Sequence, residues 1–285
     1  MQRAADARTG WGAALERGRV PLWDVVDVTS PNVARMTNYL LGGKDHYPAD
    51  RQACERLLAI APGARSVAEG AHRFLLRVTS HLAREYKVRQ FVVIGAGLPN
   101  PVDVHQIAQS IDVCSRVVYA DDDQLALAHG RALREDGRRT VVVQADPLQA
   151  ASLLLDPAVR RLVDARLPVA MLMVSVLHQI PQPAHPVGLL ERTAHLLAPG
   201  SFIAASHLVS EDAQVRRQAD AVLLEATGGR WGRVRTRSEI EPFFGTLPLL
   251  TPGLVEVSQW RPGSDRAAGR GSRAWAEYGG VAVVR

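Results

Sequence analysis

The spacing of apolar positions changes near residue 90. Upstream, apolar side chains recur every three or four residues, which predicts helices over residues 31–41, 49–61 and 64–86. Ser30 and Pro31 predict the start of the first helix, with Ser30 as its N-cap. Downstream, short segments that are apolar throughout alternate with helical patterns. The expected strands are 90–94, 116–120, 140–144, 168–175, 201–207, 254–260 and 278–284, and the expected helices are 102–110, 123–136, 186–197 and 211–226.

Continuous apolar strands separated by helices predict an α/β fold with a mainly parallel sheet that is covered on both faces. The last two strands are joined by residues 261–273, a Gly/Ser/Arg-rich loop without a helix, so we expect an antiparallel pair at the end of the sheet. Three regions are expected: a flexible leader over 1–29, an N-terminal helical cap or lid over 30–88, and a ligand-binding core over 89–285.

The composition and the net charge bear on the size of the core and on the kind of partner. The 285 residues are 47% hydrophobic, which is enough to bury a full core. The net charge is +5, from 34 Lys and Arg against 29 Asp and Glu, and aromatic residues make up only 5%. This balance does not favour a nucleic-acid partner. The denser group of Arg230, Arg233, Arg235 and Arg237 is interpreted as a solvated loop and helix start.

The cysteines and the N-terminus bear on redox chemistry and location. Cys54 and Cys114 form no CxxC motif, so neither a zinc site nor a disulfide is indicated, and both thiols are expected to be reduced and buried. Nothing in the sequence requires a metal. No apolar run approaches the length of a membrane span, and residues 1–18 lack the apolar core of a signal peptide. We therefore expect a cytoplasmic protein with no membrane partner.

The most informative motif follows the first expected strand. The apolar run 91–94 ends in Gly95-Ala96-Gly97, and the next apolar run ends at Asp121. A strand, a glycine turn, a helix, a strand and an acid form a nucleotide-binding unit, in which the acid accepts hydrogen bonds from ribose. Asn100 replaces the third glycine of a dinucleotide motif. That weakens the alternative of an NAD-dependent dehydrogenase and leaves room for an adenosine ligand without phosphates.

An N-terminal motif carries a family resemblance. Residues 34–45 read Ala-Arg-Met-Thr-Asn-Tyr-Leu-Leu-Gly-Gly-Lys-Asp, and segments 94–99, 118–121, 197–201 and 278–282 fit the same family pattern. From about residue 30 to the end, the chain resembles an actinobacterial S-adenosylmethionine-dependent methyltransferase family, formerly a domain of unknown function. The resemblance implies the Rossmann-like class I methyltransferase fold, with seven strands and an antiparallel C-terminal strand. It also implies S-adenosylmethionine as the cofactor and a context in secondary metabolism.

The resemblance also implies where the cofactor would lie. Gly95 and Gly97 would pass under its methionine part, and Asp121 would hold the ribose hydroxyls. Asp146 would accept from the adenine amino group, and Val176 and His178 would line the transfer site. The loop of Gly42, Gly43, Lys44 and Asp45 would close over the cofactor from the cap. The full set of expected cofactor-binding residues is Arg35, Tyr39, Gly42, Gly43, Lys44, Asp45, Gly95, Gly97, Asp121, Asp122, Asp146 and Val176.

Several cap residues have two interpretations. Arg35, Tyr39 and Lys44 could pack the cap, or they could bind the cofactor carboxylate, for which a guanidinium is well suited. Asp45 could pair near Lys44 or take the cofactor amino group. Asp146 precedes Pro147 and could be a turn residue.

The polar residues at the strand ends are also open to two interpretations. Asp122 and Asp123 are expected to cap the following helix, because carboxylates are favoured at helix N-termini. His178 is the candidate catalytic residue; it could be a general base or a structural hydrogen-bond donor. His207 has the same alternatives at the next strand.

Val93 departs from the family pattern, which usually has Asp at this position and uses it to support the glycine loop and the cofactor amino group. Losing such a bond costs roughly 1.5–3 kcal/mol, or about ten- to a hundredfold in affinity, unless Asp45 or Asp122 compensates. The leading hypothesis is methyl transfer to an O, N or C atom of an unidentified small molecule. The alternative is a methyltransferase-like protein that binds cofactor or metabolite without turnover. The oligomeric state is open, with a homodimer as one option.

Overall fold

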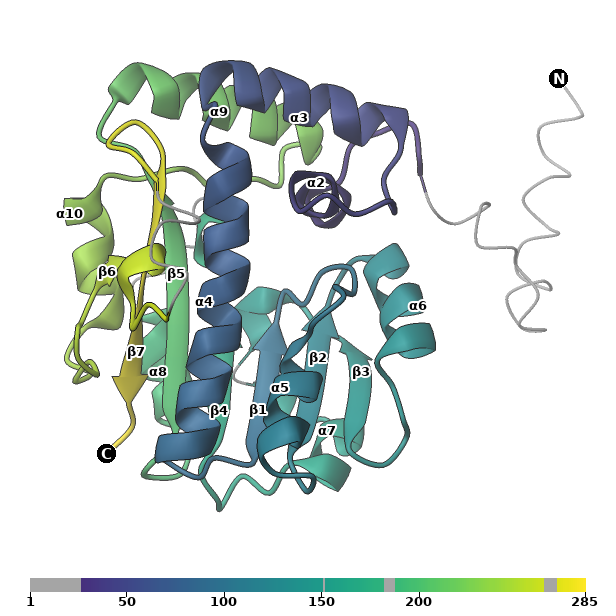
Figure 1. Ribbon diagram of the computed structural model, residues 1–285, viewed down its shortest axis with the longest axis vertical. Helices are drawn as coiled ribbons and strands as arrows, with labels where there is room; N and C mark the ends of the chain where they lie inside the picture. Colours follow the sequence, from purple (N-terminus) through teal and green to yellow (C-terminus); the bar gives the residue numbers. More distant parts are fainter. Residues whose placement is uncertain (1–26, 151, 182–187, 264–270) are drawn as a thin grey trace, which may run out of the picture.

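A computed structural model describes residues 27–150, 152–181, 188–263 and 271–285. Seven strands form one sheet in the order β3-β2-β1-β4-β5-β7-β6 (Figure 1). Most of the expected leader, and part of the helix expected over 186–197, lie outside the described residues. The strands are β1 (Gln90–Ile94), β2 (Arg116–Asp121), β3 (Thr140–Gln144), β4 (Ala170–Met173), β5 (Phe202–Val209), β6 (Val255–Glu256) and β7 (Ala276–Val283).

The sheet is parallel except for its C-terminal strand. Val92 of β1 lies beside Val118 of β2 and Met171 of β4, and both pairings are parallel. Strand β7 runs antiparallel to both of its neighbours, with Ala204 of β5 opposite Val281. This arrangement confirms the predicted mainly parallel, seven-stranded sheet with an antiparallel C-terminal strand.

Helices cover both faces of the sheet and extend above it (Figure 1). Successive strand residues point to opposite faces, as Phe91 and Val93 do against Val92 and Ile94. Helices α4, α5 and α6 pack on the first face, and α7, α8 and α10 on the second. The helices are α2 (Val33–Leu40), α3 (Pro48–Ile60), α4 (Ala64–Glu85), α5 (Val104–Ile111), α6 (Gln124–Leu133), α7 (Pro157–Leu162), α8 (Leu189–Ala194), α9 (Ala213–Ala226) and α10 (Arg237–Ile240).

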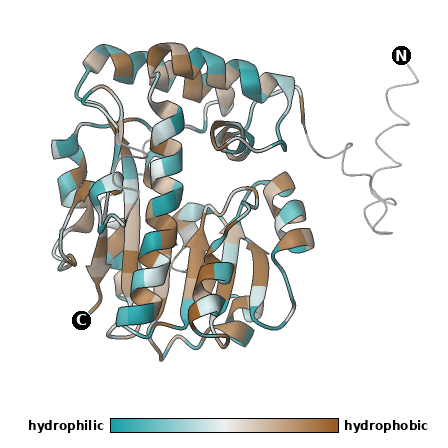
Figure 2. Ribbon diagram, in the orientation of Figure 1, coloured by the Kyte–Doolittle hydropathy of each residue, from teal (hydrophilic) through white to brown (hydrophobic). Residues whose placement is uncertain are grey.

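The helical cap has its own apolar core, joined to the sheet by α4. Figure 2 shows hydrophobic strands at the centre and hydrophilic positions along the outer helices. The first half of α4 packs with α2, α3 and α9, whereas Phe74, Val78 and Leu82 in the second half pack on the sheet. Helix α9, from late in the chain, lies beside α3 and completes the cap (Figure 1). One continuous helix therefore fixes the cap relative to the sheet.

Some local predictions were wrong in detail. The N-cap of α2 is Asn32 and not Ser30, because the Asn32 amide oxygen reaches the N–H groups of Ala34 and Arg35. Strand β6 is shorter than expected and turns into a 3-10 helix at Val257. Cys54 is buried as expected, but Cys114 is exposed. Among the described helices, none is long and apolar enough to cross a membrane.

Candidate functional site

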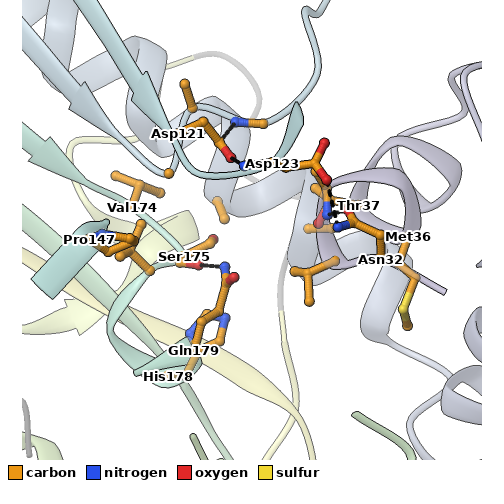
Figure 3. Close-up of a pocket in the computed structure, with 18 of the residues that line it drawn as sticks. Asn32, Met36, Thr37, Asp121, Asp123, Pro147, Val174, Ser175, His178 and Gln179 are labelled. Atoms are coloured by element: carbon orange, nitrogen blue, oxygen red, sulfur yellow. Dashed lines mark hydrogen bonds between the residues drawn. The ribbon is translucent and has the colours of Figure 1, made fainter. Parts of the chain in front are cut away.

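A cavity of about 470 Å³ lies between the helical cap and the ends of the parallel strands (Figure 3). Its lining comes from α2 and α4, from the segments that follow β1, β2, β3 and β4, and from α9 and β7. Ligands of α/β sheets bind outside the carboxyl ends of the strands, and this volume is in the range of small-molecule pockets. The fold therefore gathers the predicted loops around one cavity.

The turn after β1 brings bare backbone to the cavity. Gly95 and Gly97 have φ angles of +63° and +59°, which favour glycine. A Cβ at Gly95 would lie 2.6 Å from Cγ2 of Val176, whereas a Cβ at Gly97 would meet no atom within 4 Å. Conformation and space both require glycine at 95, and conformation requires it at 97. All three residues line the cavity.

Arg134 holds the glycine turn in place. Its Nη1 donates to the carbonyl of Gly97 at 2.8 Å, and its Nη2 donates to the carbonyls of Ala96 and Leu98. Its Nε lies 2.8 Å from Asp103, in an ion pair whose side chains are 2% and 5% exposed. The sequence does not predict a role for either residue, because nothing in the pattern of either helix singles them out.

Asp121 supports the same turn from the end of β2. Its Oδ2 accepts from the Gly97 N–H at 2.7 Å, and its Oδ1 accepts from the Asp123 N–H at 2.9 Å (Figure 3). Burial raises the pKa of Asp121 to about 6, although the two N–H groups favour the carboxylate. A carboxylate has about four acceptor positions, so Asp121 keeps some for a ligand in the cavity that it lines.

The other acids that follow β2 and β3 have different roles. Asp123 caps α6, because its Oδ1 accepts from the Ala126 N–H at 2.7 Å. Asp122 is exposed and lines the cavity, which corrects the expectation that both acids cap this helix. Asp146 also lines the cavity, and its Oδ1 accepts from the Leu148 N–H at 2.8 Å. It is therefore a turn residue that still faces the site.

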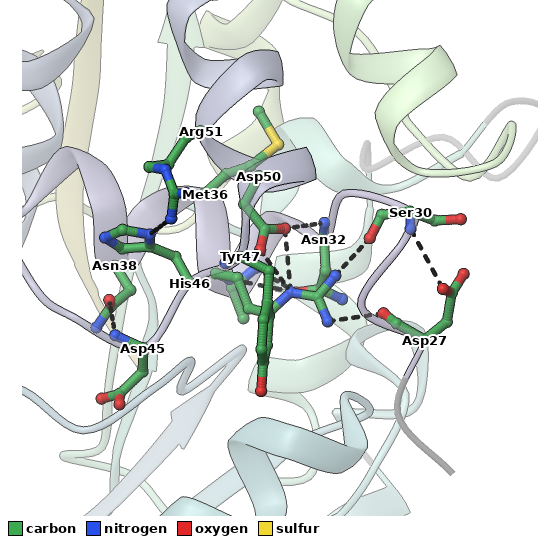
Figure 4. A network of polar contacts seen from close by, with 12 residues as sticks. Asp27, Ser30, Asn32, Met36, Asn38, Asp45, His46, Tyr47, Asp50 and Arg51 are labelled. Carbon is green, nitrogen blue, oxygen red and sulfur yellow. Dashed lines mark hydrogen bonds and ion pairs between the residues drawn. The ribbon is translucent and has the colours of Figure 1, made fainter. Parts of the chain in front are cut away.

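Arg35 lies outside the cavity lining and is engaged elsewhere. Its Nε lies 2.9 Å from the Asp50 carboxylate, and both side chains are at most 3% exposed. The guanidinium also donates to the carbonyls of Asp27 and Ser30. Asp50 accepts further bonds from the backbone N–H groups of Asn32 and Tyr47 (Figure 4). The expected contact of Arg35 with a cofactor carboxylate is thus corrected: Arg35 fixes the chain before α2.

The other expected lid residues are likewise outside the lining; they are Tyr39, Gly42, Gly43, Lys44 and Asp45. A Cβ at Gly43 would lie 2.3 Å from Nδ2 of Asn38. The Asp45 N–H donates to Oδ1 of Asn38 at 2.9 Å (Figure 4). The loop is therefore packed around Asn38 and not over the cavity. The polar side chains that α2 places in the lining are Asn32, Thr37 and Asn38.

His178 lines the cavity and is only 4% exposed. Its Nδ1 accepts from the Leu208 N–H at 3.2 Å, which leaves the proton of the neutral ring on Nε2. Burial, with a smaller effect of Arg235, lowers the pKa of His178 to about 3. His207 lies outside the lining, between the Leu208 carbonyl and Nη1 of Arg235, so its hydrogen bonds are structural.

Glu277 of β7 is a lining residue that the sequence analysis missed. It is 2% exposed, and its Oε1 accepts from Oγ of Ser175 at 2.8 Å and from Oγ of Ser206 at 2.5 Å. Burial raises the pKa of Glu277 to about 7. Ser175 has a φ of +59°, a conformation that is rare outside glycine and is concentrated at functional sites.

Much of the remaining lining is apolar. The lining includes Trp231 and Trp275, together with Leu208 and Leu223. Nε1 of Trp231 donates to Asp220 at 3.0 Å, which satisfies the only polar group of that indole. An apolar region with few polar groups is suited to a small, largely hydrophobic ligand.

The expected solvated loop and helix start is confirmed for Arg230, Arg233 and Arg237, which are exposed, and it is wrong for Arg235. Arg235 is fully buried, and Arg233 pairs with Glu239 at 2.6 Å. Arg237 lies over the ring of Tyr278 and 3.5 Å from Glu241. Arg230 lines the cavity. These separate environments do not form one basic surface.

The charged groups of the lining are predominantly acidic. Arg230 is the one permanently cationic side chain among the described lining residues. Such a balance favours a cationic ligand over one that carries phosphates. The described residues contain no group of His, Cys, Asp and Glu side chains arranged to hold a metal ion. The lining carboxyl groups belong to Asp103, Asp121, Asp122, Asp123, Asp146 and Glu277.

Comparisons with known proteins agree with this geometry. A family model described as S-adenosyl methyltransferase matches residues 22–285. A DUF574 family protein from Streptomyces avermitilis is 34% identical, with a TM-score of 0.82 over 91% of this chain and 99% of that one. A candidate methyltransferase from Thermobifida fusca is 32% identical, with a TM-score of 0.81 over 91% and 97%. No curated protein matches. The chain therefore belongs to the S-adenosyl methyltransferase family and has its class I fold and its cofactor, S-adenosylmethionine.

Proposed function

We propose that this methyltransferase transfers a methyl group to an O, N or C atom of a small, largely apolar molecule. The observation that carries the proposal is the cavity itself, in which the glycine turn and its acids share one space with Trp231 and Trp275. Cofactor and acceptor can therefore meet beneath the cap. Bound S-adenosylmethionine supplies an electrophilic methyl group, so the chain mainly has to orient the reactants and exclude water.

The acidic part of the lining fits the cofactor. S-adenosylmethionine carries a sulfonium and an amino group, and the surrounding carboxylates favour that positive charge. Gly95 and Gly97 would let the cofactor approach the backbone, and Asp121 has acceptor positions left for the ribose. Asp122 and Asp146 also line the cavity and would contact the adenosine part.

His178 would act in this site as a hydrogen-bond donor. Its low pKa makes the ring a weak base, and its Nδ1 is occupied by the Leu208 N–H. The remaining Nε2–H can orient an acceptor oxygen or nitrogen. This proposal replaces the general-base alternative for His178 and keeps the residue at the transfer site.

Val93 motivates the non-catalytic alternative, and the structure offers a partial answer to it. Val93 is 4% exposed and lines the cavity, so no carboxylate supports the glycine turn from this position. Asp121 and Arg134 support the turn instead. The loop can therefore keep its shape, while a direct partner for the cofactor amino group is lost.

The test begins with calorimetric titration of S-adenosylmethionine and S-adenosylhomocysteine, with NAD as the control. We expect micromolar binding of the first two and no comparable binding of NAD. The protein is then incubated with methyl-labelled S-adenosylmethionine and either small aromatic alcohols and amines, a protein mixture or RNA. Label in the small molecules supports the proposal. Label only in protein or RNA, or binding without transfer to any acceptor, contradicts it.

The family resemblance also favours a role in secondary metabolism. Comparing the small-molecule extracts of producing cells with and without the gene would test this placement. The loss of one methylated compound from the extract is the expected result.

A further inference from the structure

A buried polar cluster adjoins the methyl-transfer cavity on the side of β5 and β7. Glu277 lies opposite Leu208 in the strand register, and the side chain of Ser206 reaches Glu277 from β5. Ser175 comes from the turn after β4 and completes the cluster. Two separate segments thus converge on the carboxyl group of a third, β7. Glu277 forms no ion pair among the described residues, although other buried acids pair with arginine. Because burying an unpaired acid costs free energy, its position points to a function.

The hydrogen bonds of the cluster fix its proton arrangement. The Ser175 N–H donates to Oγ of Ser206 at 2.8 Å, so the hydroxyl proton of Ser206 is free to point at Glu277. Both serine hydroxyls donate to the same oxygen, Oε1. Two hydroxyls and the neighbouring Ser175 N–H leave at least one of about four acceptor positions on the carboxylate for a ligand.

We propose that Glu277 is the proton acceptor of the methyl-transfer site and that the methyl acceptor is a small aromatic molecule with an O–H or N–H group. This inference rests on the proposed function. The acceptor oxygen or nitrogen forms a bond to the methyl carbon while the carbon–sulfur bond breaks, and that bond's electron pair stays on sulfur. The acceptor proton passes to the Glu277 carboxylate and then to solvent. Trp231 and Trp275 line the same cavity, and aromatic side chains pack favourably against such a molecule.

The charges around Glu277 agree with this role. Its pKa, near 7, is close to the optimum for a general base at neutral pH. Of the elements packed against it, α4 contributes His72 to the lining and the turn after β4 contributes His178, and burial lowers the pKa of both rings, so both are neutral at pH 7. Arg230 is the cation of the lining. A bound sulfonium in this cavity would favour the ionised carboxyl further.

The first test measures proton release on cofactor binding, by calorimetry at pH 7 in two buffers with different ionisation enthalpies. S-adenosylmethionine and S-adenosylhomocysteine differ by the sulfonium charge. We expect the first to release more protons from wild type, by up to roughly half a proton for a group with a pKa near pH 7. Glu277→Gln should bind both ligands with the difference abolished, and Glu256→Gln, an acid of the neighbouring strand outside the lining, should keep it.

The second test uses 1-naphthol, 8-hydroxyquinoline and aniline as acceptor probes with methyl-labelled cofactor. We expect wild type to methylate at least one probe and Glu277→Gln to lose at least about a hundredfold in rate at saturating cofactor, within the range for general-base catalysis, with the affinity for S-adenosylhomocysteine within twofold.

The results separate the inference from the proposed function. An unchanged proton difference or an unchanged rate in Glu277→Gln overturns the role of Glu277, and methylation of none of the probes overturns the acceptor class. Failure of folded wild type to bind either cofactor form overturns the proposed function itself.

Discussion

Nδ2 of Asn32 donates to Oδ2 of Asp123 at 2.8 Å, across 91 positions of sequence. The same two side chains cap α2 and α6, because Oδ1 of Asn32 accepts from Ala34 and Oδ1 of Asp123 accepts from Ala126. Both residues line the cavity (Figure 3). One hydrogen bond therefore links the helical cap to the segment after β2, within the lining of the cavity.

Substitutions at Asn32 should weaken cofactor binding more than they lower the stability of the fold. Asn32→Ser keeps an N-cap but removes the donor, and Asn32→Asp keeps the cap but places a second carboxylate against Asp123. We expect Asn32→Asp to weaken cofactor binding about tenfold, and Asn32→Ser to weaken it less, with stability changes of about 1 kcal/mol. Calorimetry and thermal unfolding measure the two effects. Equal affinities for both variants and wild type would mean that the link has no part in binding.

The two glycines of the turn should respond differently to substitution. Gly95→Ala creates a 2.6 Å contact with Val176 in addition to backbone strain, whereas Gly97→Ala creates strain alone. We expect Gly95→Ala to lower the free energy of unfolding by more than the roughly 1–2 kcal/mol expected at Gly97. Adding Val176→Ala should restore part of the loss at Gly95 and none at Gly97. A double-mutant cycle by denaturant unfolding checks this, and additive effects at Gly95 would exclude the contact as the cause.

The sequence predicted the features that depend only on residues close together in the chain. Apolar runs marked six of the seven strands closely, and Gly95, Gly97 and Asp121 could be placed because turn, strand and acid follow one another locally. Asp156 and Pro157 also mark the start of α7, as its N-cap and its first residue, although the pattern of apolar residues does not predict this helix. These features depend on short-range physics, which a single sequence displays directly.

The errors concern residues whose role depends on distant partners. Arg35 looked like a ligand-binding arginine because its motif lies beside a glycine loop, but its partner Asp50 is on the next helix. Glu277 looked unremarkable because Ser175 and Ser206 lie 102 and 71 positions away. The alternation of apolar residues assigns a strand residue to a face, and only the packed structure shows what that face meets.

Arg134 should be needed for the shape of the glycine turn. Arg134→Gln removes the cationic partner of Asp103 and several bonds to carbonyls at once. Breaking a buried ion pair costs about 3–5 kcal/mol, and we expect a loss of stability in this range with weaker cofactor binding. Arg89→Gln, which breaks an exposed pair with Asp112, is the control and should change stability by at most about 1 kcal/mol. Comparable thermal shifts in the two variants would contradict the assigned role.

Glu277 should lower stability as the pH rises. Its folded pKa, about 7, exceeds its ordinary value of 4.5, so the folded state binds the proton more tightly than the unfolded state. The contribution of Glu277 to stability is therefore greatest below pH 4.5 and falls until about pH 7. Glu277→Gln stays neutral, so it should match wild type near pH 4.5 and be more stable above pH 7, by on the order of 3 kcal/mol. Unfolding curves of both proteins from pH 4.5 to 8 test this, and a constant difference would exclude ionisation as the cause.

Val93→Asp tests whether the missing acid limits cofactor binding. Residue 93 lies in β1 between Tyr119 and Leu172 and lines the cavity, so a carboxylate there would face the cofactor's cationic amino group. We expect affinity to rise about tenfold or more, from a charge-assisted bond of roughly 1.5–3 kcal/mol. The ligand-free variant should be less stable, since it buries a charge without a partner. Val93→Asn, similar in shape but uncharged, is the control and should gain much less affinity. If the two variants bind alike, Asp121 and Arg134 already supply what the turn needs, and the acid adds nothing at this position.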